Sequence, residues 1–293
     1  MSKRKYFLSI LVSLSLGVAI FTFSGCSLTD NESIVPAYLI IDDVKLSTNI
    51  DLQGVASEEI NEVFVFADGV SLGVYPLPAR IPVIVSGTQM NIVVGASIHP
   101  SGYKNSTVEY PFYGRESYNL DLESGKDYPI DVTFKYLNEA KFDFIESFEN
   151  GSFFINDLDT LGSTKMEIAS EGVLSNHSGV LSVDEFNYIN EVGTENLFLR
   201  SNNLGSYTYL EFDYKNDIDY YVGVRYVEGT RLIKEQVYLF VPSEDWNHFY
   251  LDLTNWISSS TIESYSVFFG VRAYSDDEVT RKVFLDNIKL IHF

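Results

Sequence analysis

Tyr221-Val222-Gly223-Val224-Arg225 and Phe268-Phe269-Gly270-Val271-Arg272 are two segments with the same order of side chains. Along each, apolar residues alternate with an aromatic residue, a glycine and an arginine, and this two-residue period is that of a β-strand with two different faces. The aliphatic positions predict a face in a core. The aromatic, glycine and arginine positions predict the opposite, outward face.

The same alternation continues through the second half of the chain. Polar turns separate alternating runs at 207–215, 219–228, 235–241, 248–253, 264–274 and 282–292. This succession predicts an antiparallel sandwich of two sheets. The predicted core side chains are Leu210, Phe212, Tyr214, Val222, Val224, Tyr226, Val237, Leu239, Val241, Phe249, Leu251, Leu253, Val267, Phe269 and Val271. The opposite register holds Tyr209, Glu211, Tyr221, Gly223, Arg225, Tyr238, Phe240, Phe268, Gly270, Arg272 and Tyr274.

Residues 37–138 also predict strands, because short apolar runs alternate with turn residues and no window keeps the 3.6-residue period of a helix. The clearest strands are 37–41, 62–67, 81–85, 91–96, 117–122 and 128–136. Asp68-Gly69 between two apolar runs predicts a tight hairpin. The adjoining G-x-S-x-G match around Ser71 is predicted to be part of this turn, because Pro76 and Pro78 exclude the helix that a nucleophile elbow needs.

Composition excludes several classes of partner. The 293 residues carry a formal net charge of −21, and an acidic surface repels nucleic-acid phosphates and anionic lipid headgroups. The one cysteine cannot form an internal disulfide, so the fold has to depend on its core. An aromatic content of 15% is ample for such a core and argues against disorder.

The N-terminal leader contains lysines and an arginine at 3–5, an apolar run at 6–23 and then Ser24-Gly25-Cys26. This is the order of a secretory signal, with a transmembrane segment as the alternative. It resembles a bacterial lipoprotein signal with its lipobox, although Phe23 stands where that family usually has Leu. The resemblance implies that 1–25 is removed and that Cys26 is diacylated.

The segment after Cys26 predicts a polar tether over 26–36. Its acidic residues Asp30 and Glu32 loosely resemble the export signals on surface-exposed lipoproteins of Bacteroidetes. We therefore expect an outer-membrane protein that contacts the membrane through its lipid.

Two further resemblances concern the folded parts. Asp68-Gly69, Leu72-Gly73, Pro76, Gly87 and Gly102-Tyr103 resemble the PEGA-like and immunoglobulin-like modules of bacterial surface proteins, which implies a spacer or adhesion module over 37–138. The segments 142–151, 176–183, 246–253 and 284–290 resemble the jelly-roll sandwiches of the galactose-binding-like superfamily, which includes many carbohydrate-binding modules. The second resemblance implies a jelly roll over 139–293.

The predicted outward face suggests a binding surface for sugar. Tyrosine rings stack on the C–H side of a pyranose, arginine donates to hydroxyls or a uronate, and glycine opens a groove between them. The candidate residues are Tyr221, Arg225, Tyr238, Arg272 and Tyr274. The alternative is an ordinary outer face whose arginines pair with carboxylates and whose aromatic rings are covered by the first domain.

The jelly-roll resemblance also implies a structural Ca²⁺ held by Glu146 or Glu149 together with Asp286. Asp286 shares its register with Phe284 and Ile288, and a carboxylate on an inward face needs a cation or several donors. The alternative is that Asp286 caps a turn or accepts backbone N–H groups.

No catalytic constellation emerges from the sequence. The four histidines, at 99, 177, 248 and 292, have no metal-ligand spacing, and no thiol remains once Cys26 is modified. We therefore expect a non-catalytic envelope lipoprotein whose second domain binds glycan. The alternative is a structural or adhesion protein that docks another envelope protein.

Overall fold

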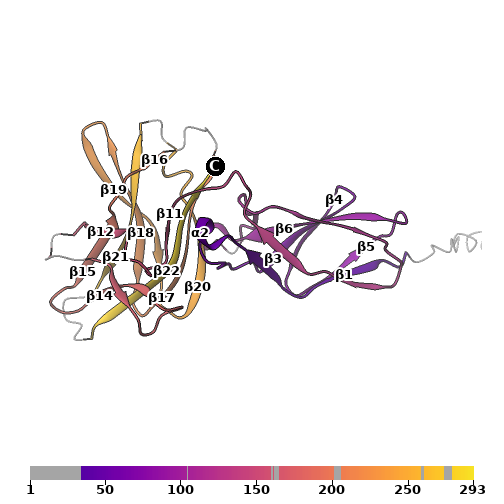
Figure 1. The fold of residues 1–293 in the computed structure, drawn as a ribbon, viewed down its shortest axis with the longest axis horizontal. Helices are drawn as coiled ribbons and strands as arrows, with labels where there is room; N and C mark the ends of the chain where they lie inside the picture. The colour runs from indigo at the N-terminus through magenta and orange to yellow at the C-terminus, as the bar shows by residue number, and fades with distance from the viewer. Residues whose placement is uncertain are drawn as a thin grey trace, which may run out of the picture.

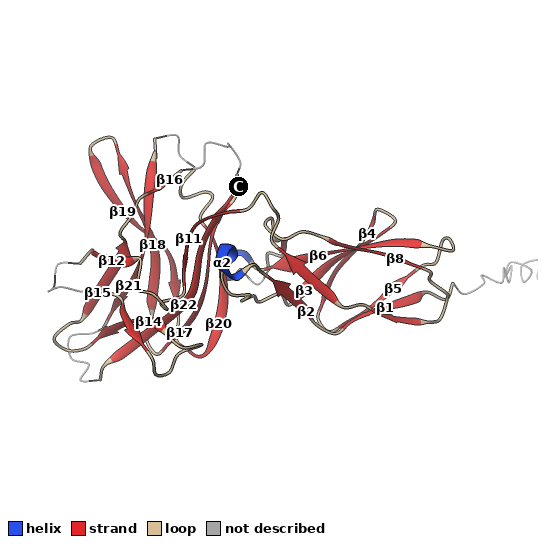
Figure 2. Ribbon diagram, viewed as in Figure 1, coloured by secondary structure: helices blue, strands red, loops and turns tan. Residues whose placement is uncertain are grey.

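The computed structural model describes residues 34–103, 105–159, 161, 165–200, 206–258, 261–273 and 279–293. The leader, Cys26 and candidate residue Tyr274 lie outside these residues. Two β-rich bodies follow one another along the long axis of the molecule (Figures 1 and 2). The prediction of an all-β protein is confirmed, and the described residues add to the strands one helical turn, α2 (Ile50–Gln53), and one 3-10 turn, η1 (Pro100–Gly102). Neither of these, nor any other helix in the described ranges, has the length and apolar character needed to cross a membrane.

The described residues of the N-terminal body form ten strands. They are β1 (Ala37–Ile41), β2 (Val44–Ser47), β3 (Glu62–Ala67), β4 (Val70–Pro76), β5 (Ala79–Val83), β6 (Met90–Ile98), β7 (Val108–Glu109), β8 (Glu116–Leu120), β9 (Asp127–Pro129) and β10 (Val132–Lys135). One sheet has the order β4-β3-β6-β7, with β8 also paired to β6, and the remaining strands form the ladders β5-β1-β9 and β10-β2. The alternating burial of β1 and β3 places their aliphatic side chains in one core.

The predicted hairpin at Asp68-Gly69 is present. Both residues have positive φ values, 48° and 79°, and β3 and β4 pair on either side of them. Positive φ at two successive positions is the geometry that Asp-Gly favours in a two-residue turn. Ser71 lies in β4 with no helix after it, so the G-x-S-x-G match is part of a hairpin as predicted.

The described residues of the C-terminal body form twelve strands. They are β11 (Lys141–Glu146), β12 (Phe154–Asp157), β13 (Glu167–Ala169), β14 (Ser178–Val183), β15 (Ile189–Thr194), β16 (Phe198–Leu199), β17 (Thr208–Asn216), β18 (Tyr220–Glu228), β19 (Arg231–Phe240), β20 (Ser243–Asp252), β21 (Ser264–Arg272) and β22 (Arg281–His292). One sheet has the order β13-β14-β22-β17-β20, with β11 paired to β22. We call it the contact sheet, because its outer face meets the N-terminal body. The other has the order β12-β15-β21-β18-β19, with β16 paired to β21, and we call it the open sheet.

The predicted sandwich is confirmed, and so are most of its core positions. Leu210, Val222, Leu251 and Val267 are buried in the single cluster between the two sheets. The alternation in the sequence therefore assigned the inner faces of β17, β18, β20 and β21 correctly.

The predicted register of β19 is wrong beyond its middle. Val222 pairs with Tyr238 but Gly223 pairs with Gln236, so Val237 is the extra residue of a β-bulge. Every side chain after a bulge changes face. Leu239 is consequently 52% exposed, whereas Tyr238 packs in the core against Phe249. Val241, also predicted in the core, is 69% exposed.

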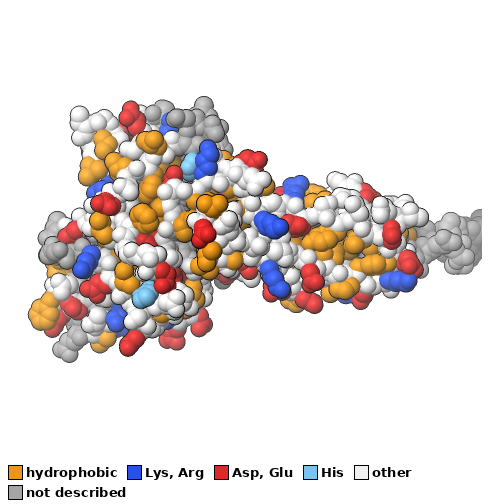
Figure 3. Space-filling model, in the orientation of Figure 1, with side chains coloured by type: hydrophobic (Ala, Val, Ile, Leu, Met, Phe, Trp, Pro, Cys, Tyr) orange, Lys and Arg blue, Asp and Glu red, His pale blue; other side chains and the backbone are white. Residues whose placement is uncertain are grey.

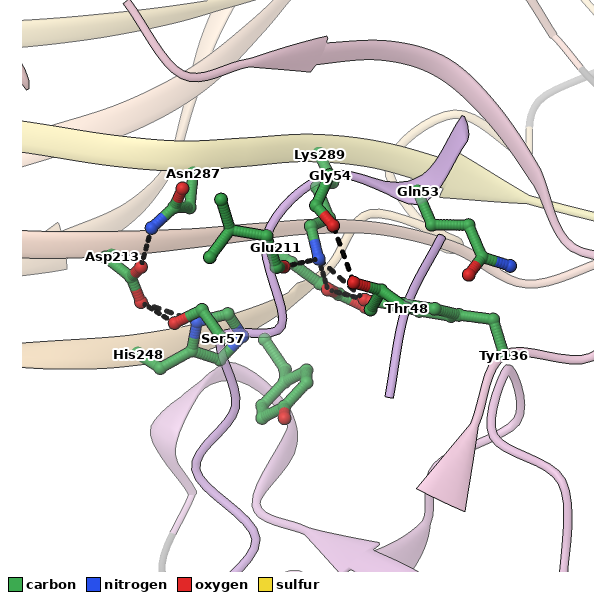
Figure 4. A network of polar contacts seen from close by, with 12 residues as sticks. Thr48, Gln53, Gly54, Ser57, Tyr136, Glu211, Asp213, His248, Asn287 and Lys289 are labelled. Carbon is green, nitrogen blue, oxygen red and sulfur yellow. Dashed lines mark hydrogen bonds and ion pairs between the residues drawn. The ribbon is translucent and has the colours of Figure 1, made fainter. Parts of the chain in front are cut away.

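The N-terminal body buries a polar network against the outer face of the contact sheet (Figure 4). Tyr110 and Tyr136 both donate hydrogen bonds to the Glu211 carboxylate, the second at 2.5 Å. Lys289 donates to the Val55 carbonyl at 2.8 Å and to the Tyr136 hydroxyl at 3.1 Å, and its Nζ lies 4.0 Å from Glu211 Oε2. Burial lowers the pKa of Lys289. The Glu211 and Lys289 side chains are both fully buried, so this contact is part of the folded core.

A second group of contacts in Figure 4 surrounds Asp213. Ser57 donates to it at 2.6 Å, Asn287 donates to it at 2.6 Å, and His248 Nδ1 lies 2.7 Å from it. Burial raises the pKa of Asp213, but the hydrogen bonds from these three neighbours outweigh that effect and the net pKa is lowered. Ser57 comes from the N-terminal body, so this carboxylate also joins the two bodies.

Candidate ligand groove

A groove of about 540 Å³ crosses the outer face of the open sheet, on the side away from the N-terminal body. Side chains from or next to four neighbouring strands line it: Glu191, Asp219, Tyr221, Lys234, Gln236, Leu239, Phe268 and Arg272. Since neighbouring strands lie about 4.8 Å apart, the groove extends roughly 14 Å across the strands.

The repeated motif forms a reciprocal pair of contacts in this groove. β18 and β21 are antiparallel neighbours, so Tyr221 faces Gly270 and Phe268 faces Gly223. A Cβ atom on Gly270 would lie 2.4 Å from the Tyr221 ring, and one on Gly223 would lie 2.2 Å from the Phe268 ring. Each ring therefore lies across the glycine of the other strand, and neither glycine can be replaced without moving a ring.

Glu191 fixes two side chains of the groove. The Tyr221 hydroxyl donates to one of its oxygens, and Lys234 forms an ion pair with the other. Burial, followed by the hydrogen bond to Glu191, raises the pKa of Tyr221 well above its ordinary value. Lys234 also donates to the Leu158 carbonyl at 3.2 Å. The Tyr221 ring is thus held at a fixed angle on the sheet.

Phe268 forms the floor of the groove and not its surface. It is only 1% exposed, and the Lys234 ammonium lies 5.8 Å from its ring centroid. Tyr221 is the half-buried ring next to it, with 6.3 Å between the two ring centroids and an interplanar angle of 82°. The aromatic face open to a ligand is therefore that of Tyr221.

Two of the five predicted ligand residues, Tyr221 and Arg272, line the groove together. Arg272 is exposed and makes no hydrogen bond or ion pair with another described residue. Arg225 is on the same face, but it faces Ser266 and donates to the hydroxyl of that residue at 3.2 Å. Positions 266 and 272 are separated by roughly 20 Å along a strand, so Arg225 lies outside the groove.

Tyr238 was predicted on the ligand face, and this prediction is wrong. The bulge in β19 turns the ring into the core, where it packs against Phe240 and Phe249. Tyr274 lies outside the described residues, and its role stays a prediction.

The sequence alone did not identify Glu191, Asp219, Lys234 or Gln236. Phe268 could have been identified as a groove residue from the sequence, because it stands in the repeated motif. Glu191 and Lys234 could not, because their ion pair depends on the strand order β15-β21-β18-β19, which no local sequence pattern encodes.

The predicted calcium ligands already have protein partners. Glu146 accepts backbone N–H groups of Phe148 and Phe153 at 2.7 and 2.6 Å. Asp286 accepts from the Ser178 hydroxyl and the Asn287 N–H, both at 2.8 Å, and burial raises its pKa to about 6.

Glu149 pairs with His177 at 3.0 Å. No group of three or more metal-ligating side chains occurs in the part of the chain that the structure describes. The calcium site stays a prediction, and the backbone-acceptor alternative agrees with the contacts of Asp286.

Comparison with known proteins gives similarity in structure only. No protein-family model matches the chain, and no curated protein does. The family 30 carbohydrate-binding module of a cellulosomal cellulase from Clostridium thermocellum is 18% identical, with a TM-score of 0.33 over 47% of this chain and 88% of that one. A second family 30 structure is 18% identical, with a TM-score of 0.36 over 52% and 87%.

A mutant family 29 carbohydrate-binding module in complex with mannohexaose is 14% identical, with a TM-score of 0.34 over 53% of this chain and 92% of that one. These similarities cover about half of the chain. The function proposed below depends on the side chains of the groove itself.

Proposed function

We propose that this chain is a lipid-anchored protein of the bacterial cell envelope that binds carbohydrate, without catalysis, in the groove of the open sheet. One observation carries the proposal: a half-buried tyrosine ring, fixed by Glu191 and lying across a glycine, adjoins an exposed arginine in a groove about 540 Å³ in volume. The face of such a ring suits the C–H side of a pyranose.

The polar side chains of the groove suit sugar hydroxyls. A hydroxyl both donates and accepts, and the groove offers donors in Arg272 and Lys234 and an acceptor in Asp219. Because Glu191 already holds Tyr221 and Lys234 in place, little side-chain entropy is lost when a ligand binds. A preorganised surface of this kind supports binding to a sugar chain.

The arrangement of Glu191 also favours binding over hydrolysis. A glycosidase needs one carboxyl that donates a proton and a second that acts on the other side of the bond. Both Glu191 oxygens already accept hydrogen bonds from the protein, one from Tyr221 and one from Lys234. Its position therefore supports a structural role in the groove.

The proposal is tested by screening residues 34–293 on an array of glycans and by titrating each hit. Tyr221→Ala should lower the affinity at least tenfold, since stacking on an aromatic ring and its neighbouring hydrogen bonds are lost together. Tyr207→Ala is the matched control, because Tyr207 is 46% exposed and does not line the groove. Absence of any glycan ligand, or an equal loss in both variants, contradicts the proposal.

A protein partner is the second candidate, favoured by the exposed apolar edge of the open sheet. β19 is the last strand of its sheet, and Leu239 and Val241 at its end are 52% and 69% exposed. Exposed apolar residues on an edge strand are a common docking feature. Capture of one envelope protein by the wild type but not by Leu239→Asp, together with silence on the glycan array, would favour this candidate.

The lipid part of the proposal depends on Cys26, the only cysteine. Cys26→Ser should abolish incorporation of a palmitate analogue and release the protein from membranes, because the thiol carries the diacylglycerol. Lack of label in the wild type would contradict a lipoprotein.

A further inference from the structure

A second hollow adjoins the groove at the end of the sandwich. It has a volume of about 430 Å³ and shares Asp219 and Arg272 with the groove. Asp217 and Arg281 also line it, so the second hollow repeats the aspartate and arginine chemistry of the first. The two hollows are therefore neighbouring sites of similar character.

Backbone pairing fixes the position of the second aspartate and arginine. The Lys282 N–H donates to the Asp217 side chain at 2.7 Å, and the Asp217 N–H donates to the Lys282 carbonyl at 3.1 Å. Arg281, the first residue of β22, is half-buried and pairs with Val183 of β14. These contacts hold Asp217 and Arg281 on neighbouring segments at one end of the sandwich.

An exposed phenylalanine lies on the turn at the same end. Phe186 is 80% exposed, in the turn that follows Val183. The Asp184 side chain accepts the N–H groups of Phe186 and Asn187 at 2.9 and 2.8 Å, and these hydrogen bonds lower the pKa of Asp184. Beyond the turn, Ile189 pairs with Arg272. The turn thus connects the two strands that pair with Arg281 and Arg272.

We infer that the ligand is a linear, uncharged glycan whose internal units occupy both hollows, with Arg281 and Phe186 as further contact residues. This inference rests on the proposed function of the groove. The shared Arg272 and Asp219 lie where one hollow continues into the next, so a chain can cross from the open face to the end of the sandwich. A repeated aspartate and arginine pair matches a repeated unit of hydroxyl groups.

The charge of the two hollows indicates an uncharged chain. The cations Lys234, Arg272 and Arg281 are matched by the anions Glu191, Asp219 and Asp217. The chain as a whole has a formal charge of −21. A polyuronate would meet a carboxylate beside every cation and a repulsive field around the protein.

The test is calorimetric titration of residues 34–293 with neutral gluco- and manno-oligosaccharides, from disaccharide to hexasaccharide, and with polygalacturonate. Affinity for the neutral series should rise with chain length, and polygalacturonate should not bind. Arg281→Ala should lower hexasaccharide affinity about tenfold, the effect of a lost charged hydrogen bond, and leave disaccharide affinity unchanged. Phe186→Ala should lower hexasaccharide affinity several-fold, and its exposure makes a folding defect unexpected.

Arg231→Ala is the matched control, because this exposed arginine begins β19 and lines neither hollow. Reduction of the terminal sugar to an alditol should leave hexasaccharide affinity unchanged, as expected for recognition of internal units. Affinity that does not depend on chain length overturns the inference and leaves the groove as a site for a single sugar. Wild-type hexasaccharide affinity in both Arg281→Ala and Phe186→Ala overturns it as well, because the ligand then does not reach the second hollow. Binding of polygalacturonate alone overturns the uncharged class, and absence of binding at every length overturns the proposed function as well.

Discussion

The two outer faces of the C-terminal sandwich carry similar side chains but have opposite surroundings. The face of the contact sheet holds Tyr209, Glu211 and Lys289, and the N-terminal body covers all three. The face of the open sheet holds Tyr221 and Arg272, and nothing in the described residues covers them fully. Aromatic and charged residues thus form the contact between the two bodies on one sheet and line the groove on the other.

The difference lies in how each charge is satisfied. Lys289 on the covered face has a carbonyl, a hydroxyl and a carboxylate around it, because a buried charge without partners is costly. Arg272 on the open face makes no hydrogen bond or ion pair with another described residue. Lys289 on the covered face and Arg272 on the open face therefore differ in the number of their protein partners. Acidic side chains do not distinguish the two bodies, because they are scattered over the visible surface of both (Figure 3).

The largest expected effect concerns the covered face. Lys289→Met should destabilise the protein by about 3–5 kcal/mol, because Glu211 is left as a buried charge without its cation. Chemical denaturation measures the loss, and exposed Lys282→Met on the same strand is the control. The double variant with Glu211→Gln should recover part of the stability. A cost below 1 kcal/mol for Lys289→Met would mean that the two faces do not differ as described.

A smaller effect is expected in the groove. Gly270→Ala should cost about 1–3 kcal/mol, because its Cβ atom would meet the Tyr221 ring at 2.4 Å and the ring must move. Glycan affinity should fall with it, although no ligand contact has been removed. Gly87→Ala is the control, since its nearest neighbour would be 3.8 Å away. Unchanged affinity in Gly270→Ala would show that the ring position does not matter for binding.

The smallest effect concerns Asp286 of the contact sheet, whose carboxyl accepts hydrogen bonds from the Ser178 hydroxyl and the Asn287 N–H. Its pKa is raised to about 6 from 3.8, so its stabilising contribution is complete below pH 3.8 and is lost as the pH rises through about 6. Asp286→Asn should therefore raise the free energy of unfolding by about 1 kcal/mol at pH 7.5. The variant avoids the cost of burying a carboxylate, and this gain should exceed the loss from weakening the two hydrogen bonds that the carboxylate accepts. At pH 3.5 the variant and the wild type should unfold together.

The same variant tests the predicted calcium ion. Thermal unfolding in chelator and in millimolar Ca²⁺ should show a higher midpoint with Ca²⁺ in the wild type and a weaker response in Asp286→Asn, since an ion that binds only the folded state stabilises it. Equal unfolding midpoints with and without Ca²⁺ in the wild type would contradict the predicted calcium site.

The alternation of side chains predicted the sandwich and most of its inner faces, because burial on one face is a local property of each strand. It failed at β19, where Val237 forms a bulge that no local pattern announces. It also placed Glu211 and Tyr221 in one outward class, although they lie on different sheets. Strand order decides which outward face is covered, and strand order is a property of the whole chain.

The buried contact between the two bodies has a mechanical consequence for the groove. At the connection between the bodies, the Leu137 N–H donates to the Phe112 carbonyl and the Ala140 N–H donates to the Leu137 carbonyl. Strand β11 begins directly afterwards, at Lys141. With charges buried across the contact as well, the two bodies should turn together as one rigid arm. The groove lies on the open sheet, which is the layer of the sandwich farther from the N-terminal body (Figure 1). A large particle whose glycan binds in the proposed groove should therefore be held at the far end of the molecule, with no hinge between the two bodies that must first be ordered.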